Sequence, residues 1–226
     1  MSLYQVFTDD DIQALFNHSC YGKFELKDRY LITQLTYLTL SLTEHNLLKV
    51  HNIVNEHGDV YKKWTLPASY TRANKERVIE VPEVFCQSLE KYLIWYVEQD
   101  LPSDYRHNLN TYMGLSSKAP VLLNDRFSEF AMSERPVKKG INKQPTNLRN
   151  KVNRLLGNAG LDWATPKTFY DSLIVNLARN NADIGQIVDA FGLSSRQVVL
   201  DKINGDLLKL GDALNQVYSR IKTTGH

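Results

Sequence analysis

The sequence predicts an α+β fold that is mainly α-helical, with a small antiparallel β-sheet. Apolar residues recur at helical spacing before residue 59 and after residue 82, whereas residues 59–81 alternate with period two around a basic turn. The first pattern is typical of amphipathic helices and the second of a β-hairpin. With 226 residues, 42% of them hydrophobic, the chain can bury one sizeable core. Because no internal repeat or low-complexity linker divides it, we expect a single domain over residues 1–226.

The N-terminal third is predicted to be helical. Thr8 precedes three aspartates, which is an N-cap followed by acids at the positive end of a helix, and Ile12, Leu15 and Phe16 share one face. Residues 28–50 are rich in Leu, Ile and Tyr at helical spacing. They predict two buried helices or one broken helix.

The remaining elements follow from the same signals. Pro82 ends the second strand of the hairpin, residues 83–98 return to helical spacing, and residues 100–145 are loop-rich with several prolines and glycines. Four further helices are expected over residues 147–159, 165–180, 183–191 and 206–222.

Composition excludes several classes of function. Cys20 and Cys86 lie far apart and the six histidines are scattered, so we expect neither a disulfide nor a metal site. His45 and His51 are interpreted as packing or surface residues, and no cofactor or small-molecule substrate is implied. Without a membrane-length apolar run or a leader peptide, the expected location is the bacterial cytoplasm or nucleoid. The net charge is only +2, so any binding of nucleic acid must depend on local basic clusters.

Four strings carry a family resemblance. They are YLTLSLTEHNLLKVHNIV (37–54), TRANKERVIEVP (71–82), TPKTFYDSLIVNLARNNADIGQIVDAFG (165–192) and GLSSRQVVLDKI (192–203). In this order and spacing they resemble the catalytic domain of tyrosine recombinases, the family of phage integrases and Xer-type enzymes, over about residues 7–210. The resemblance implies that domain's fold, without the family's separate N-terminal core-binding domain.

The resemblance also implies a chemistry that this chain has lost. The family cleaves DNA by attack of a tyrosine on a phosphodiester, with two arginines, a hairpin lysine and two histidines assisting. At the corresponding arginine, lysine, histidine, arginine, histidine and tyrosine positions stand Thr43, Arg72, Lys167, Tyr170, Leu193 and Lys202. We therefore expect no enzymatic activity. Tyr170 and Leu193 are expected to fill the vacated site, and a relocated nucleophile at Tyr218 is the least favoured interpretation.

Basic residues supply candidates for DNA contact. Arg72, Lys75 and Arg77 lie at or beside the hairpin tip, where they contact phosphate or form an ordinary solvated turn that buries little. Arg149, Lys151 and Arg154 can share one face of a helix, which is either DNA-facing or simply solvated. Lys167 and Lys202 either bind phosphate by charge or point to water. The complete set of candidates is Arg72, Lys75, Arg77, Lys139, Lys143, Arg149, Lys151, Arg154, Lys167, Arg196 and Lys202.

Residues 206–222 predict an amphipathic docking helix. Its apolar seam consists of Leu207, Leu210, Leu214, Val217 and Ile221, at spacings of three, four, three and four. The seam either folds back onto its own domain or docks onto a neighbouring copy or partner.

Two functional hypotheses result. The first is a catalytically inactive, integrase-like protein that binds double-stranded DNA with modest affinity and acts as an accessory or regulatory factor in recombination or mobile-element maintenance. The second is a protein-interaction module that binds an active recombinase or another element-encoded protein without contacting DNA.

Overall fold

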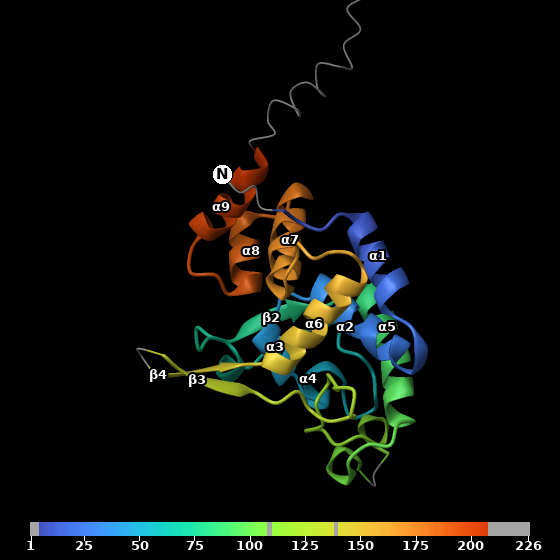
Figure 1. Cartoon of the computed structure of the whole chain (residues 1–226). Coiled ribbons are helices and arrows are strands. Elements are labelled where there is room, and N and C mark those ends of the chain that lie inside the picture. Colours follow the sequence, from blue (N-terminus) through green and yellow to red (C-terminus); the bar gives the residue numbers. More distant parts are fainter. Residues whose placement is uncertain (1–4, 108–109, 138–139, 208–226) are drawn as a thin grey trace, which may run out of the picture.

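The computed structural model describes residues 5–107, 110–137 and 140–207 (Figure 1). Its α-helices in chain order are α1 (Asp9–Ser19), α2 (Glu25–Tyr37), α3 (Leu42–Leu47), α4 (Val50–Ile53), α5 (Glu83–Val97), α6 (Thr146–Asn158), α7 (Pro166–Arg179), α8 (Ile184–Phe191) and α9 (Arg196–Leu207). The strands are β1 (Lys63–Leu66), β2 (Arg77–Glu80), β3 (Ser133–Val137) and β4 (Gly140–Gln144). Short 3₁₀ helices lie at Gly22–Phe24, Ala68–Tyr70, Ser103–Tyr105 and Tyr112–Gly114.

The start of α1 confirms the predicted cap. The Thr8 hydroxyl accepts a hydrogen bond from the Asp11 backbone N–H at 3.2 Å, and the Asp11 carboxylate accepts one from the Thr8 N–H at 2.8 Å. This reciprocal capping box satisfies two backbone donors that have no partner inside the helix. Leu15 is fully buried, and Ile12 and Phe16 pack against the same core, so the predicted apolar face is confirmed.

The main core lies between α2 and α5. The rings of Tyr30 and Tyr92 stack with centroids 4.2 Å apart, and both side chains are buried. The Tyr92 hydroxyl donates to the backbone carbonyl of Val121 at 2.9 Å, and the Tyr96 hydroxyl donates to that of Pro120 at 2.9 Å. These bonds tie the loop-rich middle of the chain to α5. The buried helical region predicted over residues 28–50 is confirmed, divided into α2, α3 and the start of α4.

The predicted hairpin is confirmed as the antiparallel pair β1–β2, in which Trp64 lies opposite Ile79 and Leu66 opposite Arg77. Its alternating burial puts Trp64, Leu66 and Ile79 inward, where they join the main core. Pro82 follows the second strand, as the sequence predicts, and is also the N-cap of α5.

A second hairpin, β3–β4, is not expected from the sequence, because residues 100–145 are loop-rich. Its strands pair antiparallel from Ser133–Gln144 to Val137–Gly140, and Figure 1 shows it extending away from the helices. Glu134, Pro136 and Lys143 are exposed. Period-two alternation identifies strands with one buried face, and SERPV and GINKQ do not show that pattern.

The C-terminal helices α7, α8 and α9 lie together at one end of the molecule (Figure 1). Ile174, Ile187, Phe191 and Val199 form a second buried cluster between them. Helices α6, α7 and α8 match their predicted ranges to within one residue at either end, whereas α9 is not expected from the sequence as a separate helix.

The predicted C-terminal docking helix lies almost wholly outside the described residues. Leu207 is the last residue of α9, while Leu210, Leu214, Val217 and Ile221 lie beyond them. Of the helices in the described ranges, none is long and apolar enough to cross a lipid bilayer.

Candidate functional site

The six positions that the family resemblance assigns to catalytic residues lie on several parts of the fold. Thr43 is in α3, Arg72 is in the turn between β1 and β2, Lys167 and Tyr170 are in α7, Leu193 follows α8, and Lys202 is in α9.

Asp171 joins two of these positions. Its carboxylate is buried in α7, and Lys202 Nζ lies 2.6 Å from Asp171 Oδ1. Lys167, one helical turn before Asp171, donates to Oδ2. The side chain of Lys202 is 9% exposed and that of Lys167 is 68% exposed. Lys202 thus does not point to water, one of its two expected roles, and Lys167 keeps much of its surface available to an anion.

Tyr170 occupies the space between α7 and α8. Its hydroxyl donates to the Phe191 carbonyl at 3.1 Å, and the two rings meet edge to face with centroids 4.9 Å apart. Burial of the phenol raises the pKa of Tyr170 to about 12, so it stays neutral. Leu193 packs against the second buried cluster, which includes Phe191. These two side chains contribute apolar contacts and no charge.

The expectation that Arg77 lies at the exposed hairpin tip is wrong. Its side chain is 7% exposed, and Nη2 lies 2.5 Å from the Glu44 carboxylate. Nη1 donates to the backbone carbonyls of Thr39 and Ala190 at 2.8 and 2.7 Å. Arg77 shares the inward face of β2 with Ile79, so the period-two pattern is the signal that could have revealed its burial.

Arg72 and Lys75 are exposed in the turn of the first hairpin, as predicted. The Thr71 hydroxyl shapes this turn, because it accepts from the Lys75 N–H at 3.0 Å and donates to the Lys75 carbonyl at 2.9 Å. Asn74 adopts φ of 51°, a left-handed conformation that asparagine tolerates better than most residues. The local hydrogen bonds therefore hold the turn while both basic side chains face solvent.

The expectation of a shared basic face on α6 is wrong for Lys151. Its side chain is 7% exposed, with Nζ 2.7 Å from Asp28 Oδ2 and 3.4 Å from Asp125 Oδ1. Lys151 lies three residues after the buried Leu148 and four before the buried Leu155, so helical spacing places it on the apolar stripe.

The other basic candidates on and around α6 vary in exposure. Arg149 is exposed, and Arg154, with a 57% exposed side chain, pairs with Asp125 at 2.8 Å. Lys143 pairs with Glu134 at 3.1 Å on the second hairpin, and Arg196 is exposed at the start of α9. The remaining candidate, Lys139, lies outside the described residues.

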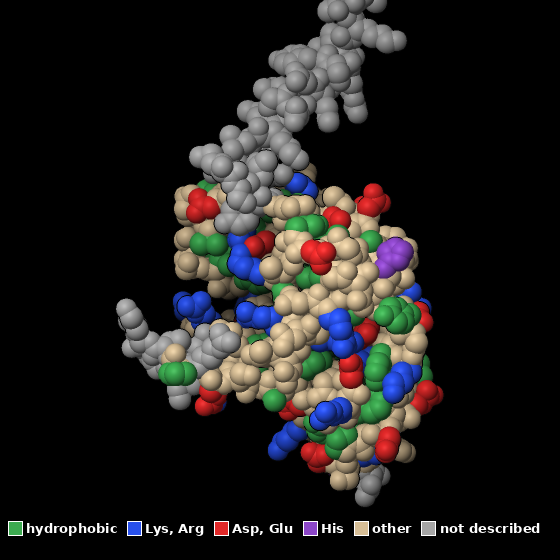
Figure 2. All heavy atoms as spheres, viewed as in Figure 1, with side chains coloured by type: hydrophobic (Ala, Val, Ile, Leu, Met, Phe, Trp, Pro, Cys, Tyr) green, Lys and Arg blue, Asp and Glu red, His purple; other side chains and the backbone are tan. Residues whose placement is uncertain are grey.

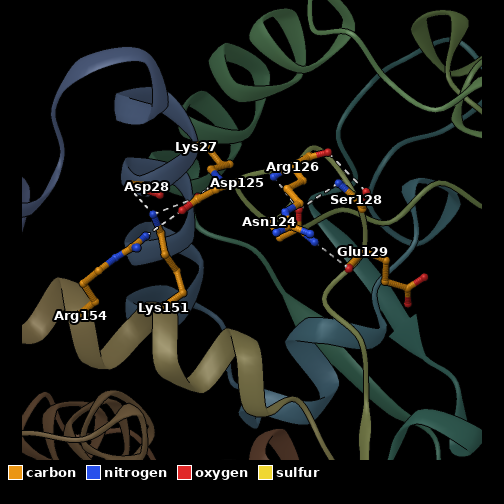
Figure 3. Close-up of polar contacts among 9 residues, drawn as sticks. All are labelled: Lys27, Asp28, Asn124, Asp125, Arg126, Ser128, Glu129, Lys151 and Arg154. Atoms are coloured by element: carbon orange, nitrogen blue, oxygen red, sulfur yellow. Dashed lines mark hydrogen bonds and ion pairs between the residues drawn. The ribbon is translucent and has the colours of Figure 1, made fainter.

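Sequence reasoning missed the acidic partners in this part of the molecule. Lys27 of α2 and Lys151 of α6 are both buried, and Asp28 and Asp125 supply their counter-charges (Figure 3). Lys27 and Asp28 lie at the edge of a stretch predicted only as buried helix, and Asp125 lies in one predicted as loop. No local pattern marks any of the three.

His45 is a packing residue. It is 1% exposed, its Nδ1 lies 2.9 Å from Gln34 Nε2, and burial lowers its pKa to about 3. His51 is exposed, and its Nδ1 contacts the Ser117 carbonyl at 2.7 Å. The described residues hold no group of three or more His, Cys, Asp or Glu placed to bind a metal ion.

In the view of Figure 2 the surface is hollowed beside the side chains of α7–α9, and Lys and Arg side chains border this hollow.

Solved structures resemble this fold, although no known sequence family matches the chain. Neither a protein-family model nor a curated protein matches the sequence. Among solved structures, the XerA recombinase superposes with a TM-score of 0.64 at 15% identity, covering 100% of this chain and 68% of that one. The catalytic domain of bacteriophage HP1 integrase superposes with a TM-score of 0.51 at 11% identity, covering 98% of both chains. The chain has the tyrosine-recombinase catalytic fold.

Two further tyrosine recombinases match. The XerH recombinase bound to its difH substrate superposes with a TM-score of 0.62 at 15% identity over 95% of this chain and 53% of that one. The Tn1549 transposon integrase with circular intermediate DNA gives 0.58 at 12% identity, over 89% and 61%. The chain therefore spans about half to two thirds of these longer recombinases. At such identities the likeness shows the fold, and it confirms the fold that the four sequence strings implied.

Proposed function

We propose that this protein binds duplex DNA through phosphate contacts and does not cleave it, acting as an accessory or regulatory factor in recombination or mobile-element maintenance. The observation that carries the proposal is the ion pair between Lys202 and Asp171. The family resemblance assigns Lys202 to the position of the nucleophilic tyrosine, and the Lys202 ammonium is buried 2.6 Å from the Asp171 carboxylate.

The absence of cleavage follows from the chemistry of the altered positions. An ammonium group has no lone pair with which to attack phosphorus, and the tyrosine that replaces the second arginine is neutral and hydrogen-bonded to a backbone carbonyl. Loss of one preorganised donor to the transition state typically slows such a reaction by about 10²- to 10³-fold. Thr43 and Tyr170 replace both arginines, so the losses accumulate.

Three features support DNA binding. The XerH and Tn1549 structures that share this fold contain DNA. Basic side chains border the hollow in Figure 2. Seven of the candidate cations keep exposed side chains, namely Arg72, Lys75, Lys143, Arg149, Arg154, Lys167 and Arg196. Electrostatic contacts of this kind give micromolar to submillimolar affinities that are insensitive to sequence, about 10⁻⁴ to 10⁻⁶ M at physiological salt.

The test of inactivity uses suicide substrates that trap a covalent protein–DNA intermediate. We expect no denaturant-resistant adduct and no relaxation of supercoiled plasmid, with an active tyrosine recombinase as the positive control. An adduct that disappears in the Tyr218→Phe variant would overturn the proposal and assign a relocated nucleophile.

The test of binding is a titration of duplex DNA at several salt concentrations. Each neutralised phosphate contributes about −0.9 to the slope of log K against log salt, so we expect a clearly negative slope that Arg72→Glu with Lys75→Glu makes shallower. No binding at low salt would instead favour the protein-interaction module.

A further inference from the structure

Three cations converge on one carboxylate beside α6. Lys27 reaches Asp125 from α2, while Lys151 and Arg154 reach it from successive turns of α6 at 3.4 and 2.8 Å (Figure 3). Lys151 also holds Asp28 at 2.7 Å. The cluster has three positive and two negative charges, so Asp125 cancels one charge that α6 would otherwise present.

The loop that carries Asp125 is held in position by its own hydrogen bonds. The Asn124 side-chain oxygen accepts from the backbone N–H groups of Arg126 and Ser128 at 2.8 and 3.2 Å, and its amide donates to the Glu129 carbonyl at 3.0 Å (Figure 3). Asp125 therefore meets the cations without any rearrangement of the chain. Its carboxylate is 36% exposed, so it also faces solvent.

A cavity of about 310 Å³ opens at this cluster. Its polar lining consists of Asn124, Asp125, Asn147, Asn150, Lys151 and Arg154. Asn147, Asn150 and Arg154 lie on one side of α6 at spacings of three and four, and Asn150 and Arg154 are exposed. No acidic residue lies in the first turn of α6. Apart from Asp125, the polar groups at this mouth can donate hydrogen bonds to an anion.

The three cations differ in how accessible they are to an anion from solvent. Lys27 and Lys151 have side chains that are 3% and 7% exposed, so they are committed to the interior. Arg154 is 57% exposed and uses Nη2 for Asp125. A guanidinium forms its strongest contact with a phosphate through two parallel N–H groups, so the contact with Asp125 competes with that geometry.

We propose that the mouth of this cavity is a phosphate-contact site, at which Asp125 competes with a DNA phosphate for Arg154 and thereby lowers the affinity of the protein for DNA. This rests on the proposed function and deepens it by naming one contact and the group that opposes it. Asn147 and Asn150 are the neutral donors of the same site.

The competition has a signature that a purely structural role does not share. Asp125→Asn removes the counter-charge of Lys27 and the more distant of the two carboxylates that pair with Lys151, so the variant has a lower thermal midpoint than the parent. It also releases Arg154, so the variant binds DNA more tightly. One additional phosphate contact steepens the salt slope by about 0.9, which makes the loss of affinity between 50 and 200 mM salt about 3- to 4-fold larger than in the parent.

Glu129→Gln is the matched control, because it removes one negative charge from the same loop. Glu129 pairs with Lys49 at 3.0 Å, away from α6. We expect Glu129→Gln to leave the salt slope unchanged. If Asp125→Asn and Glu129→Gln change the slope equally, or if Asp125→Asn binds DNA less tightly than the parent, the competition is overturned.

A second pair of variants tests the same contact if Asp125→Asn folds poorly. Arg154→Ala removes an exposed ion pair and should fold normally. Because Asp125 competes for Arg154, Arg154→Ala reduces the slope by clearly less than the reduction of about 0.9 expected for Arg149→Ala on the same helix. An equal reduction in both variants would overturn the competition while leaving DNA binding intact. If neither the parent nor Asp125→Asn binds duplex DNA at low salt, the proposed function fails, and the competition fails with it.

Discussion

The buried pair between Arg77 and Glu44 allows a sharp test of how the fold is held together. Arg77 begins β2, Glu44 lies in α3, and the same guanidinium donates to the carbonyl of Ala190 at the end of α8. One side chain thus connects the first hairpin, the N-terminal helices and the C-terminal group of helices. The perturbation is Arg77→Met, which keeps an apolar stem of similar length and removes the charge.

The expected loss of stability is large because the ion pair is shielded from water. The side chains of Arg77 and Glu44 are 7% and 9% exposed, so Arg77→Met leaves a buried carboxylate without its counter-charge. Breaking such a pair lowers the free energy of unfolding by about 3–5 kcal/mol. For a chain of this length each kcal/mol moves the thermal midpoint by about 2–4 °C, so we expect a decrease of about 6–20 °C.

The assay is thermal unfolding followed by circular dichroism at constant pH and salt. Arg72→Met is the matched control, because Arg72 is exposed in the turn of the same hairpin and its replacement should change stability by no more than about 0.5 kcal/mol. The double variant Arg77→Met, Glu44→Leu should recover a large part of the loss, since both charges are removed together.

If the thermal midpoint of Arg77→Met lies within about 2 °C of that of the parent, Arg77 does not connect these elements through a buried ion pair. It would then again be a candidate for DNA contact. The same reasoning applies to a triple variant in which Arg72, Lys75 and Arg77 are all replaced by glutamate. Its thermal midpoint should fall well below that of the parent, because the Arg77→Glu change places a second carboxylate beside Glu44 in the interior.

Three further predictions concern single buried groups. Burial lowers the pKa of His45 to about 3, whereas the unfolded chain has a value near 6.5, so the unfolded chain binds more protons between these two pH values. The free energy of unfolding therefore falls as the pH decreases from about 6.5 to about 3, by up to about 1.4 kcal/mol per pH unit. A His45→Gln variant that retains this steepness in urea titrations would contradict the assignment. Tyr92→Phe loses a hydrogen bond to a backbone carbonyl and should lower the free energy of unfolding by about 1 kcal/mol. Tyr30→Phe should be neutral or stabilising, because the Tyr30 hydroxyl has no hydrogen-bond partner in the described part of the chain. Equal urea midpoints for the two variants would contradict this. Asp171→Asn should lower stability measurably, since it breaks the buried ion pair between Asp171 and Lys202. An unchanged urea midpoint would show that this ion pair does not hold α9 to α7.

Much of the fold could be predicted from local patterns. The cap at Thr8, the alternation across β1 and β2, and the helical spacing of α5 to α8 are properties of neighbouring residues, which is why the amino-acid sequence is enough to predict them. One exception, β3–β4, exposes Glu134, Pro136 and Lys143, so its sequence lacks the alternation that reveals a strand with one buried face.

The candidate site was predicted less well, because a charged side chain is taken to be exposed unless the sequence shows otherwise. Arg77 and Lys151 are both predicted to lie at the surface, either contacting DNA or solvated, yet each follows the spacing of an apolar face, Arg77 with Ile79 on β2 and Lys151 with Leu148 on α6. That spacing is visible in the sequence. What cannot be seen there is an acidic partner close enough to make the burial of each charge tolerable.

The sequence by itself determined the types and order of most elements, the hairpin with its exposed Arg72 and Lys75, and the family likeness of the fold, because these depend on periodicity and short strings. Only the tertiary structure decided which charges are available to a partner. The partner of Lys151 lies 123 residues away at Asp28, that of Lys27 lies 98 residues away at Asp125, and Arg77 meets the carbonyl of Ala190 across 113 residues. Burial of a charge is decided by such distant partners, since removing an ion from water is costly until an opposite charge is brought beside it by packing.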